Sequence, residues 1–284
     1  MIGVLFDGLA YGSLLFLVSL GLSVQMGLMN FVNLAHGAFA MAGGYVCALA
    51  ATRLGVPFLA ALPLAFLAAA LAGALLERLL YRRLYGASAL DQVLFSIGLT
   101  LMSIAAATRL FGASQQPVRV PELLRGQLHF AGADFGIYRI FLIAVVAALT
   151  AALALLVGRT RFGAQLRAAV DDARVARGMG IDVDRVFTLA FALGSGLAGL
   201  GGALGIEVLG LDPTFPLKYM VYFLLVVVVG GAGTLAGPLV AAAILGVCDV
   251  AAKYYLPQLG AFAIYAVMVA LLIAFPAGIL GRRA

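Results

Sequence analysis

Long apolar segments, separated by short polar stretches, recur along the whole chain. Several of them approach or exceed the roughly 18 to 20 residues with which a helix crosses about 30 Å of hydrocarbon. Their Ala-, Leu- and Gly-rich sequences do not alternate between polar and apolar positions, as the strands of a membrane barrel do. The pattern therefore predicts an all-α fold, a single transmembrane domain over residues 1–284 built as a polytopic bundle of about eight or nine spans with interrupted helices.

Short connections separate most of the expected spans. The spans are residues 5–28, 32–52, 57–80, 90–111, 138–158, 186–210, 219–232, 236–253 and 260–280. The seventh and eighth are short for full crossings and are separated by the sequence GGAGTLAGP. If one of them re-enters the membrane, the bundle has eight crossings, and otherwise it has nine.

The composition fits a membrane protein, and the basic residues predict its orientation. Only 11% of the residues are charged, against about 25% in soluble domains, and the mean hydropathy is +1.13. Because Lys and Arg are enriched in cytoplasmic loops, we expect the net charge of +6 to reflect topology and not a nucleic-acid partner. The richer side holds Arg78, Arg82, Arg83, Arg159, Arg161, Arg167, Arg174, Arg177, Arg185, Arg282 and Arg283, and the other side holds Arg53, Arg109, Arg119, Arg125, Arg139, Lys218 and Lys253. This bias predicts an outer N-terminus and a cytoplasmic C-terminus.

Two connecting loops are longer than turns. Residues 112–137 are expected outside, either as an irregular cap or as a surface where an extracytoplasmic partner docks. Residues 158–185 are expected in the cytoplasm, where the pattern predicts one short helix ended by Gly178 and Gly180. The positions at helical spacing are Leu166, Val170, Ala173 and Arg177, with Ala169, Ala176 and Gly180 on a neighbouring stripe. Such a helix is either a solvated connector or a small-residue surface that docks into a groove of a soluble partner.

Polar side chains inside the apolar spans are the candidates for function, because they are costly in lipid and usually face the bundle interior or a water-filled path. In the fourth span they share one helix face, at Gln92, Ser96, Thr100 and Ser103. Gln25 and Glu207 are further polar residues of this kind. The stripe either lines a pathway or hydrogen-bonds to neighbouring helices.

The sequence NFVNLAHG, residues 30–37, predicts a helix break at membrane depth. The side chains of Asn33 or His36 can satisfy the N–H groups that such a break leaves free, and the same groups attract a carboxylate. Residues 230–246 suggest a second break, with Thr234 as the candidate cap and Pro238 near the next helix start. The candidate translocation-path residues are Asn30, Asn33, His36, Gln92, Ser96, Thr100 and Thr234.

Motifs for enzymatic chemistry are absent from the sequence. Both lysines are followed by Tyr, so no phosphate-binding G-x-x-x-x-G-K-[ST] motif occurs. The two His and two Cys are far apart and no H-E-x-x-H occurs, so we expect neither a metal site nor a catalytic residue. The strongest rival is an intramembrane serine protease using Ser195 with His36 or His129, although nothing else marks Ser195 as activated.

Three motifs then carry a family resemblance. NFVNLAHGAFAMAGGY, RAAVDDARVARGMGIDVDRV and VVVVGGAGTLAGPLVAAAILG occur in this order, and nearly the whole chain resembles the LivH-type permease subunits of branched-chain amino-acid ABC importers. The resemblance implies a permease subunit of an ATP-driven importer in the bacterial cytoplasmic (inner) membrane, with alternating access and no cofactor of its own. It also implies its partners: a LivM-like second permease subunit, two ATPase subunits that bind the ATP, and an extracytoplasmic substrate-binding protein.

The resemblance also assigns a role to the cytoplasmic loop. In the family, the region matching residues 168–182 resembles the coupling loop that docks on the ATPase. Carried over to this chain, the resemblance implies that the residues in contact with the ATPase are Ala169, Asp171, Asp172, Ala173, Ala176, Gly178, Gly180 and Ile181. Relatives more usually have Glu-Asp at Asp171-Asp172, and the acidic character is kept. With ATP as the driving force, we expect His36 to be a structural hydrogen-bonding residue and not a proton carrier.

The substrate stays open at this point. Branched-chain amino acids are the first choice from the resemblance, while similar permeases serve urea, short amides and other amino acids. A passive channel for a small neutral solute is the alternative from a different class, and it leaves the small-residue cytoplasmic helix without a purpose.

Overall fold

Helices make up nearly all of the regular structure. The structure is a computed structural model that describes residues 1–280 except 30, 32, 118, 119, 131, 132, 232–234 and 277. Its helices are α1 (Ile2–Met29), α2 (His36–Arg53), α3 (Phe58–Leu79), α4 (Ala89–Phe111), α5 (Ile137–Arg159), α6 (Arg161–Asp171), α7 (Ala173–Gly178), α8 (Val183–Leu209), α9 (Phe215–Gly230), α10 (Ala236–Tyr255) and α11 (Gly260–Ala274). The all-α helical bundle is confirmed within these residues.

Short elements interrupt the helices at both ends of the bundle. Two are 3-10 helices, η1 (Tyr81–Leu84) and η2 (Glu122–Leu124). The strands β1 (Gln127–Phe130) and β2 (Ala133–Gly136) form an antiparallel hairpin. This hairpin corrects the expectation of an irregular cap in residues 112–137, because part of that loop is a regular two-stranded ribbon.

Among the described residues, six helices are long and apolar enough to cross a membrane: α1, α3, α4, α5, α8 and α10. The helices α9 and α11 have 16 and 15 residues, which at 1.5 Å per residue is about 24 and 23 Å, less than the roughly 30 Å hydrocarbon core. The chain is therefore polytopic, while the count of eight or nine spans stays a prediction.

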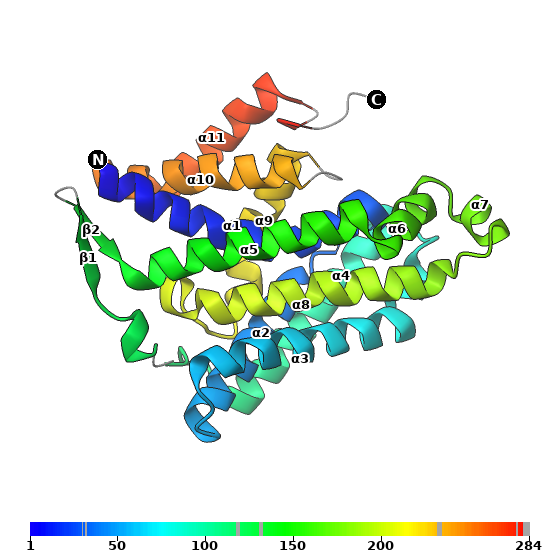
Figure 1. Cartoon of the computed structure of the whole chain (residues 1–284), viewed down its shortest axis with the longest axis horizontal. Coiled ribbons are helices and arrows are strands. Elements are labelled where there is room, and N and C mark those ends of the chain that lie inside the picture. Colours follow the sequence, from blue (N-terminus) through cyan, green and yellow to red (C-terminus); the bar gives the residue numbers. More distant parts are fainter. Residues whose placement is uncertain are drawn as a thin grey trace.

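Helix α8 runs through the centre of the bundle, where it packs against α1, α2 and α3 (Figure 1). Of its membrane-length segment, 78% is buried. Glycines permit this packing: a Cβ on Gly202 would overlap the carbonyl oxygen of Ala40 in α2, and one on Gly43 would overlap the backbone of Gly199. The glycine-rich run of α8 thus brings helix backbones together, as small residues do in membrane proteins.

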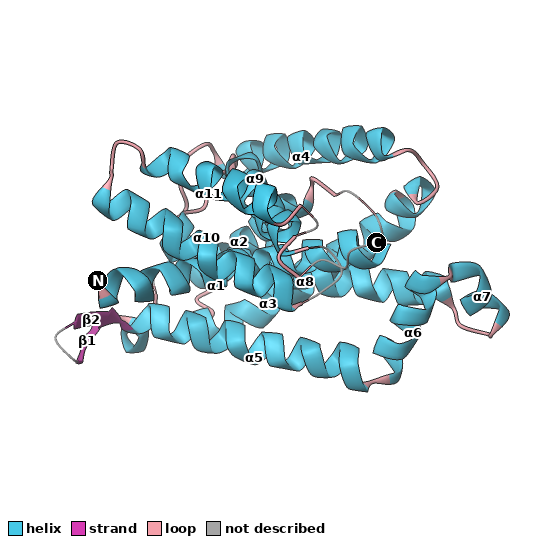
Figure 2. Cartoon of the chain, turned by 90° about the horizontal axis from the view of Figure 1, so that it is seen from above, coloured by secondary structure: helices cyan, strands magenta, loops and turns pink. Residues whose placement is uncertain are grey.

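The helices α4 and α5 lie on opposite sides of α8 (Figure 2). Only 17% of the membrane-length segment of each is buried, and large apolar side chains such as Leu94 and Met102 are exposed on α4. These outer faces are suited to lipid or to another apolar protein surface.

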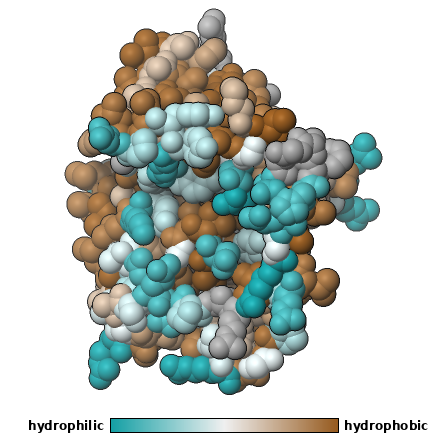
Figure 3. Space-filling model, turned by 90° about the vertical axis from the view of Figure 1, so that its left-hand side faces the viewer, coloured by the Kyte–Doolittle hydropathy of each residue, from teal (hydrophilic) through white to brown (hydrophobic). Residues whose placement is uncertain are grey.

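The bundle has two distinct ends. The N-terminus and the hairpin lie at one end, and α6 and α7 lie at the other (Figure 1). At the first end hydrophilic side chains gather, with hydrophobic side chains along the flanks (Figure 3). The long loops 112–137 and 158–185 therefore lie at opposite ends, as the predicted topology requires.

Candidate functional site

The break between α1 and α2 is organised by the buried side chain of Asn33. Its Oδ1 accepts hydrogen bonds from the backbone N–H of Ala35 (3.0 Å) and from the hydroxyl of Tyr81 (3.0 Å). Its Nδ2 donates to Oε1 of Gln25 in α1 (2.8 Å). Asn33 therefore satisfies an N–H group at the start of α2 and ties the break to α1 and η1.

His36 begins α2 and is buried against α1. Its Nε2 lies 2.8 Å from the carbonyl oxygen of Val18, so Nε2 carries the proton and donates it in this hydrogen bond. Gly21 leaves room for the ring, because a Cβ there would lie 2.7 Å from Cε1 of His36. His36 thus fixes α2 to α1, and its predicted neighbour Asn30 lies outside the described residues.

The polar stripe of α4 faces the bundle. Gln92, Ser96 and Thr100 are all buried. The hydroxyls of Ser96 and Thr100 donate to backbone carbonyls within α4 at 2.9 and 2.8 Å, and Nε2 of Gln92 donates to the carbonyl of Leu84 (3.1 Å). The Thr100 hydroxyl also lies 3.5 Å from the carbonyl oxygen of Leu34 in the break. The structure therefore brings Thr100 beside the backbone of the break, while Thr234 lies outside the described residues.

The segment predicted to be cytoplasmic forms two helices, α6 and α7, and the prediction of a single helix was wrong. Asp172 is extended (φ −154°, ψ 100°), and its Oδ1 accepts hydrogen bonds from the backbone N–H groups of Arg174 and Val175 (2.8 and 2.9 Å). This side chain ends α6 and caps α7. After α7 the chain turns at Gly180, whose φ of +84° favours glycine.

A separate apolar cluster holds α6 and α7 against α1 and α8. Its buried members are Val24, Leu166, Ala169, Ala176, Val183, Val186 and Ala190. Two residues carried over as ATPase contacts, Ala169 and Ala176, are thus turned into this chain. Of the others, Ala173 and Ile181 are half-buried, and Asp171, Asp172, Gly178 and Gly180 are exposed.

The exposed surface of α7 and the turn after it includes two large apolar side chains that the sequence analysis did not single out. Val175 is 56% exposed and Met179 is 77% exposed. They lie between the exposed Arg174 and Gly180 at the far end of the bundle. Neither residue falls on the two stripes predicted for this segment, and that departure was the available signal for this apolar tip.

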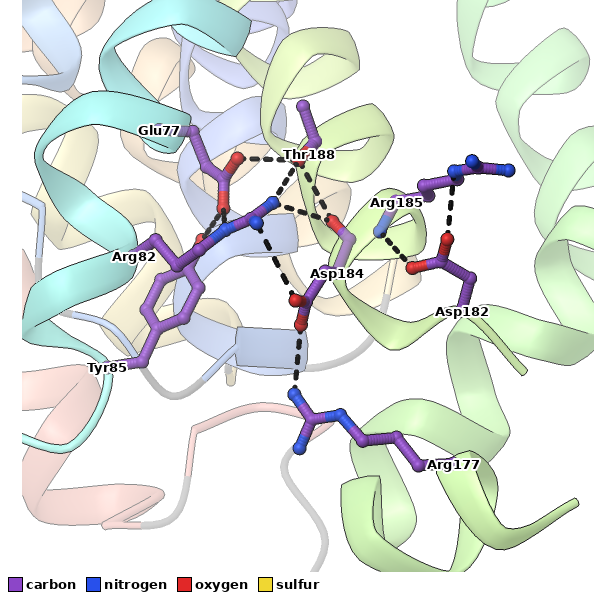
Figure 4. A network of polar contacts seen from close by, with 8 residues as sticks. All are labelled: Glu77, Arg82, Tyr85, Arg177, Asp182, Asp184, Arg185 and Thr188. Carbon is purple, nitrogen blue, oxygen red and sulfur yellow. Dashed lines mark hydrogen bonds and ion pairs between the residues drawn. The ribbon is translucent and has the colours of Figure 1, made fainter. Parts of the chain in front are cut away.

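A network of polar contacts, also missed from the sequence, links the C-terminal end of α3 to α8 (Figure 4). The buried carboxylate of Glu77 accepts hydrogen bonds from the hydroxyls of Tyr85 (2.8 Å) and Thr188 (2.6 Å). Nε of Arg82 lies 3.5 Å from Glu77 Oε1, and its Nη2 donates to the Thr188 hydroxyl (3.0 Å). Burial and the Glu77 carboxylate raise the pKa of Tyr85, so its hydroxyl stays protonated as a donor.

This network reaches α7 through Asp184 at the start of α8. Nη1 of Arg82 lies 3.6 Å from one carboxylate oxygen of Asp184, and Nη2 of Arg177 in α7 lies 2.9 Å from the other. The neighbouring Asp182 pairs instead with Arg185 at 2.8 Å. The partners of Glu77 lie as far as 111 residues away along the chain, so no local sequence pattern could reveal the network.

Two hollows at the opposite end are lined in part by Pro117 and by residues 120–122 and 124–126. One, of about 810 Å³, lies beside the α2–α3 turn and includes Thr52, Glu122 and Arg125 in its lining. Another, of about 530 Å³, shares Arg125 and adds Arg139 and Glu207. Both signs of charge therefore line this end of the molecule, and Arg139 also pairs with Asp7 in α1.

The geometry around the candidate nucleophile does not fit hydrolysis. Ser195 Oγ is buried without a hydrogen-bond partner in the part of the chain that the structure describes. His36 bonds to Val18 and His129 to Asp134, whereas an activated serine needs its base within about 2.6 to 3.2 Å. Among the described residues, no group of three His, Cys, Asp or Glu side chains could hold a metal ion.

Apolar helices of membrane-spanning length and an interrupted helix pair define a multi-pass membrane protein. Residues 4–275 match the family described as the permease component of the branched-chain amino acid transport system, and the chain belongs to this family. The resemblance carried by the three motifs is confirmed, and the chain is a multi-pass protein of the inner membrane.

Curated relatives match over nearly the full chain. The high-affinity branched-chain amino acid transport system permease protein BraD of Pseudomonas aeruginosa is 28% identical, over 98% of this chain and 95% of that protein. The corresponding permease protein LivH of Escherichia coli strain K12 is 26% identical, over 98% and 94%. A probable branched-chain amino acid transport permease protein LivH of Methanocaldococcus jannaschii is 28% identical, over 98% and 92%. No solved structure matches the chain significantly.

Proposed function

We propose that the chain is the transmembrane permease subunit of an ATP-driven importer of branched-chain amino acids. The observation that carries this proposal is the cytoplasmic segment α6–α7. It is anchored to α1 and α8 by its own apolar cluster and exposes Val175 and Met179 to the solvent. An exposed apolar tip rimmed by charged side chains is typical of a protein docking site, and a passive channel would have no use for it.

One of the two ATPase subunits, which bind the ATP, docks on this tip. The contact includes the exposed Asp171, Asp172, Gly178 and Gly180, with Val175 and Met179 at its centre. Ala169 and Ala176 act from inside the chain by holding α6 and α7 in position, and Ala173 and Ile181 lie at the boundary. A LivM-like second permease subunit completes the membrane part, and an extracytoplasmic binding protein delivers the substrate at the end that holds the hairpin.

Transport proceeds by alternating access. Closure of the ATPases displaces α6 and α7, and the displacement reaches α1 and α8 through the apolar cluster that joins them. The break before α2 lets the two neighbouring helices change their relative tilt, with Asn33 and His36 as the polar groups that brace it. Thr100 lies beside the same break. We assign it to the pathway together with Gln92 and Ser96, which are also buried on α4, and with Asn30 and Thr234.

The outer hollows support a zwitterionic substrate. Arg125 and Glu207 line the same hollow, which offers a partner for a carboxylate and one for an ammonium group. Leucine, isoleucine and valine carry both groups, and so do other amino acids, whereas urea and short amides carry neither. Competition against labelled leucine uptake separates these substrate classes.

A variant at the apolar tip tests the docking. Met179→Glu places a charge in the proposed ATPase contact, and because the side chain is 77% exposed the substitution leaves the fold intact. We expect mild-detergent purification of the tagged wild-type chain to recover an ATPase and a second permease subunit, and the variant to lose the ATPase alone. Leu123→Glu, at an 87% exposed apolar position at the opposite end, is the control that keeps it. Recovery of the wild-type chain without an ATPase would contradict the proposal.

A further inference from the structure

The 3-10 helix η1 contacts both the helix break before α2 and the polar network around Glu77 through two consecutive side chains. Tyr81 is buried and donates its hydroxyl to Oδ1 of Asn33 (3.0 Å). Arg82, the next residue, directs its guanidinium to Asp184, 3.6 Å away. Neighbouring residues of a 3-10 helix are about 120° apart around its axis, so one short turn can reach both partners.

The inner part of this connection is fixed. Glu77 is buried and is surrounded by Arg82, Tyr85 and Thr188, which belong to α3–η1 and α8 (Figure 4). Separating these groups would leave a carboxylate in the protein interior without partners, which is strongly unfavourable. The end of α3, η1 and the start of α8 are therefore expected to move as one body.

The outer part of the connection can open. Arg177 and Asp184 form a 2.9 Å pair whose side chains are 58% and 49% exposed, and exposed ion pairs contribute little to stability. The helix α7 that carries Arg177 has six residues and follows α6 through the extended Asp172. A displacement of α7 can therefore break or re-form this pair without unfolding the network behind it.

We propose that η1 transmits the displacement of α7 to the helix break before α2. Asp184 is shared between Arg177 of α7 and Arg82 of η1, and Tyr81 passes the resulting movement of η1 to Asn33. Asp184 and Tyr81 are positioning residues in this relay and do not contact the substrate. The inference rests on the proposed function, because it needs an ATPase that moves α7.

The test uses the complete complex, purified with its co-expressed subunits and reconstituted in lipid nanodiscs. ATP hydrolysis is measured with and without leucine-loaded binding protein, and the ratio of the two rates is the readout of coupling. Tyr81→Phe removes the hydroxyl that bonds Asn33 and keeps the ring. Asp184→Asn removes the charge that Arg177 and Arg82 share.

Tyr81→Phe and Asp184→Asn each have a matched control. For Tyr81→Phe the control is Tyr45→Phe, which removes a buried hydroxyl that has no hydrogen-bond partner among the described residues. For Asp184→Asn the control is Asp182→Asn, which removes a charge two residues before Asp184 that pairs only with Arg185 in the part of the chain that the structure describes.

Arg177→Gln is a third test variant. It removes the charge with which α7 holds Asp184, at an exposed position where folding is not at risk.

The relay predicts that Tyr81→Phe, Asp184→Asn and Arg177→Gln each lower the stimulation ratio at least about fivefold, the lower end of typical coupling between sites. Both controls keep the wild-type ratio. The stimulation ratio of the double variant, Tyr81→Phe with Asp184→Asn, is no lower than that of the more strongly affected single variant, because both substitutions interrupt one route. Subunit recovery and thermal stability of the complex stay at the wild-type level, which separates the relay from a purely structural role.

Three results would overturn the relay. They are an unchanged ratio in the single variants, effects that multiply in the double variant, and a loss confined to assembly or thermal stability. A wild-type complex that lacks an ATPase, or whose hydrolysis does not respond to the loaded binding protein, would instead overturn the proposed function, and the relay with it.

Discussion

Asn33 shows how one residue can stabilise an interrupted membrane helix. Its Oδ1 accepts two hydrogen bonds and its Nδ2 donates one, so three of its four hydrogen-bonding positions are used. The partners come from the break itself, from α1 and from η1. At membrane depth the hydrocarbon offers these groups no replacement partners.

Asn33→Leu tests this role. The substitution preserves the side-chain size but leaves the Ala35 N–H, the Tyr81 hydroxyl and Gln25 Oε1 without their partner. Because an unsatisfied buried polar group costs about 1 to 3 kcal/mol, we expect the free energy of unfolding to fall by about 3 kcal/mol. Denaturant titration in detergent micelles, followed by circular dichroism, measures the change. Tyr45→Phe serves as the comparison, and equal stability of the two variants would refute the role.

At the scale of elements, the packing of α8 depends on backbone approach. Gly202 lies against Ala40 and Gly43 lies against Gly199, so the backbones of α2 and α8 come into direct contact at these two points. This contact holds the helix that follows the break against the centre of the bundle. Small residues permit such close approach of helix backbones in membrane proteins.

Gly202→Ala is expected to separate the two helices. The added Cβ overlaps the Ala40 carbonyl, and overpacking of this kind costs about 1 to 3 kcal/mol. The matched control is Gly98→Ala in α4, where a Cβ meets nothing within 4 Å and where Ala stabilises a helix by about 0.5 to 1 kcal/mol. Thermal unfolding of both variants should shift in opposite directions, and a stabilising effect of Gly202→Ala would show that the crossing is not tight.

Elements with a clear hydrophobic pattern were predictable, and those set by single contacts were not. The spans expected at 57–80 and 90–111 agree closely with α3 and α4, because length and hydropathy determine them. The division between α6 and α7 depends on one capping side chain, Asp172, and the apolar periodicity continues through it. The hairpin was missed because each of its strands has only four residues.

The candidate site was predictable to a similar extent. The polar break at Asn33 and the shared face of Gln92, Ser96 and Thr100 followed from local sequence, and in the structure Thr100 lies beside the break. The Glu77 network did not, because a single Glu in an apolar span has no periodicity and its partners are remote. The inward orientation of Ala169 and Ala176 depends on packing against α1 and α8, which the loop sequence alone does not contain.

At the scale of the whole molecule, the two ends of the bundle have different chemistry. One end carries hollows lined by charges of both signs, and the other carries the apolar tip of α7 and a network that leads inward from it. The break before α2 lies between these two ends, where it contacts α1, η1 and α4. This arrangement suits a subunit that receives a zwitterion at one end and mechanical work at the other.

Uptake of labelled leucine into proteoliposomes tests the central claim most directly. The chain is reconstituted with its co-purified subunits, the binding protein is placed on one side and ATP on the other. We predict that leucine accumulates above its outside concentration only when ATP is present, and that isoleucine and valine compete while urea does not. Leucine entry that merely equilibrates and ignores ATP, or uptake that urea abolishes, would contradict the assignment as an ATP-driven importer of branched-chain amino acids.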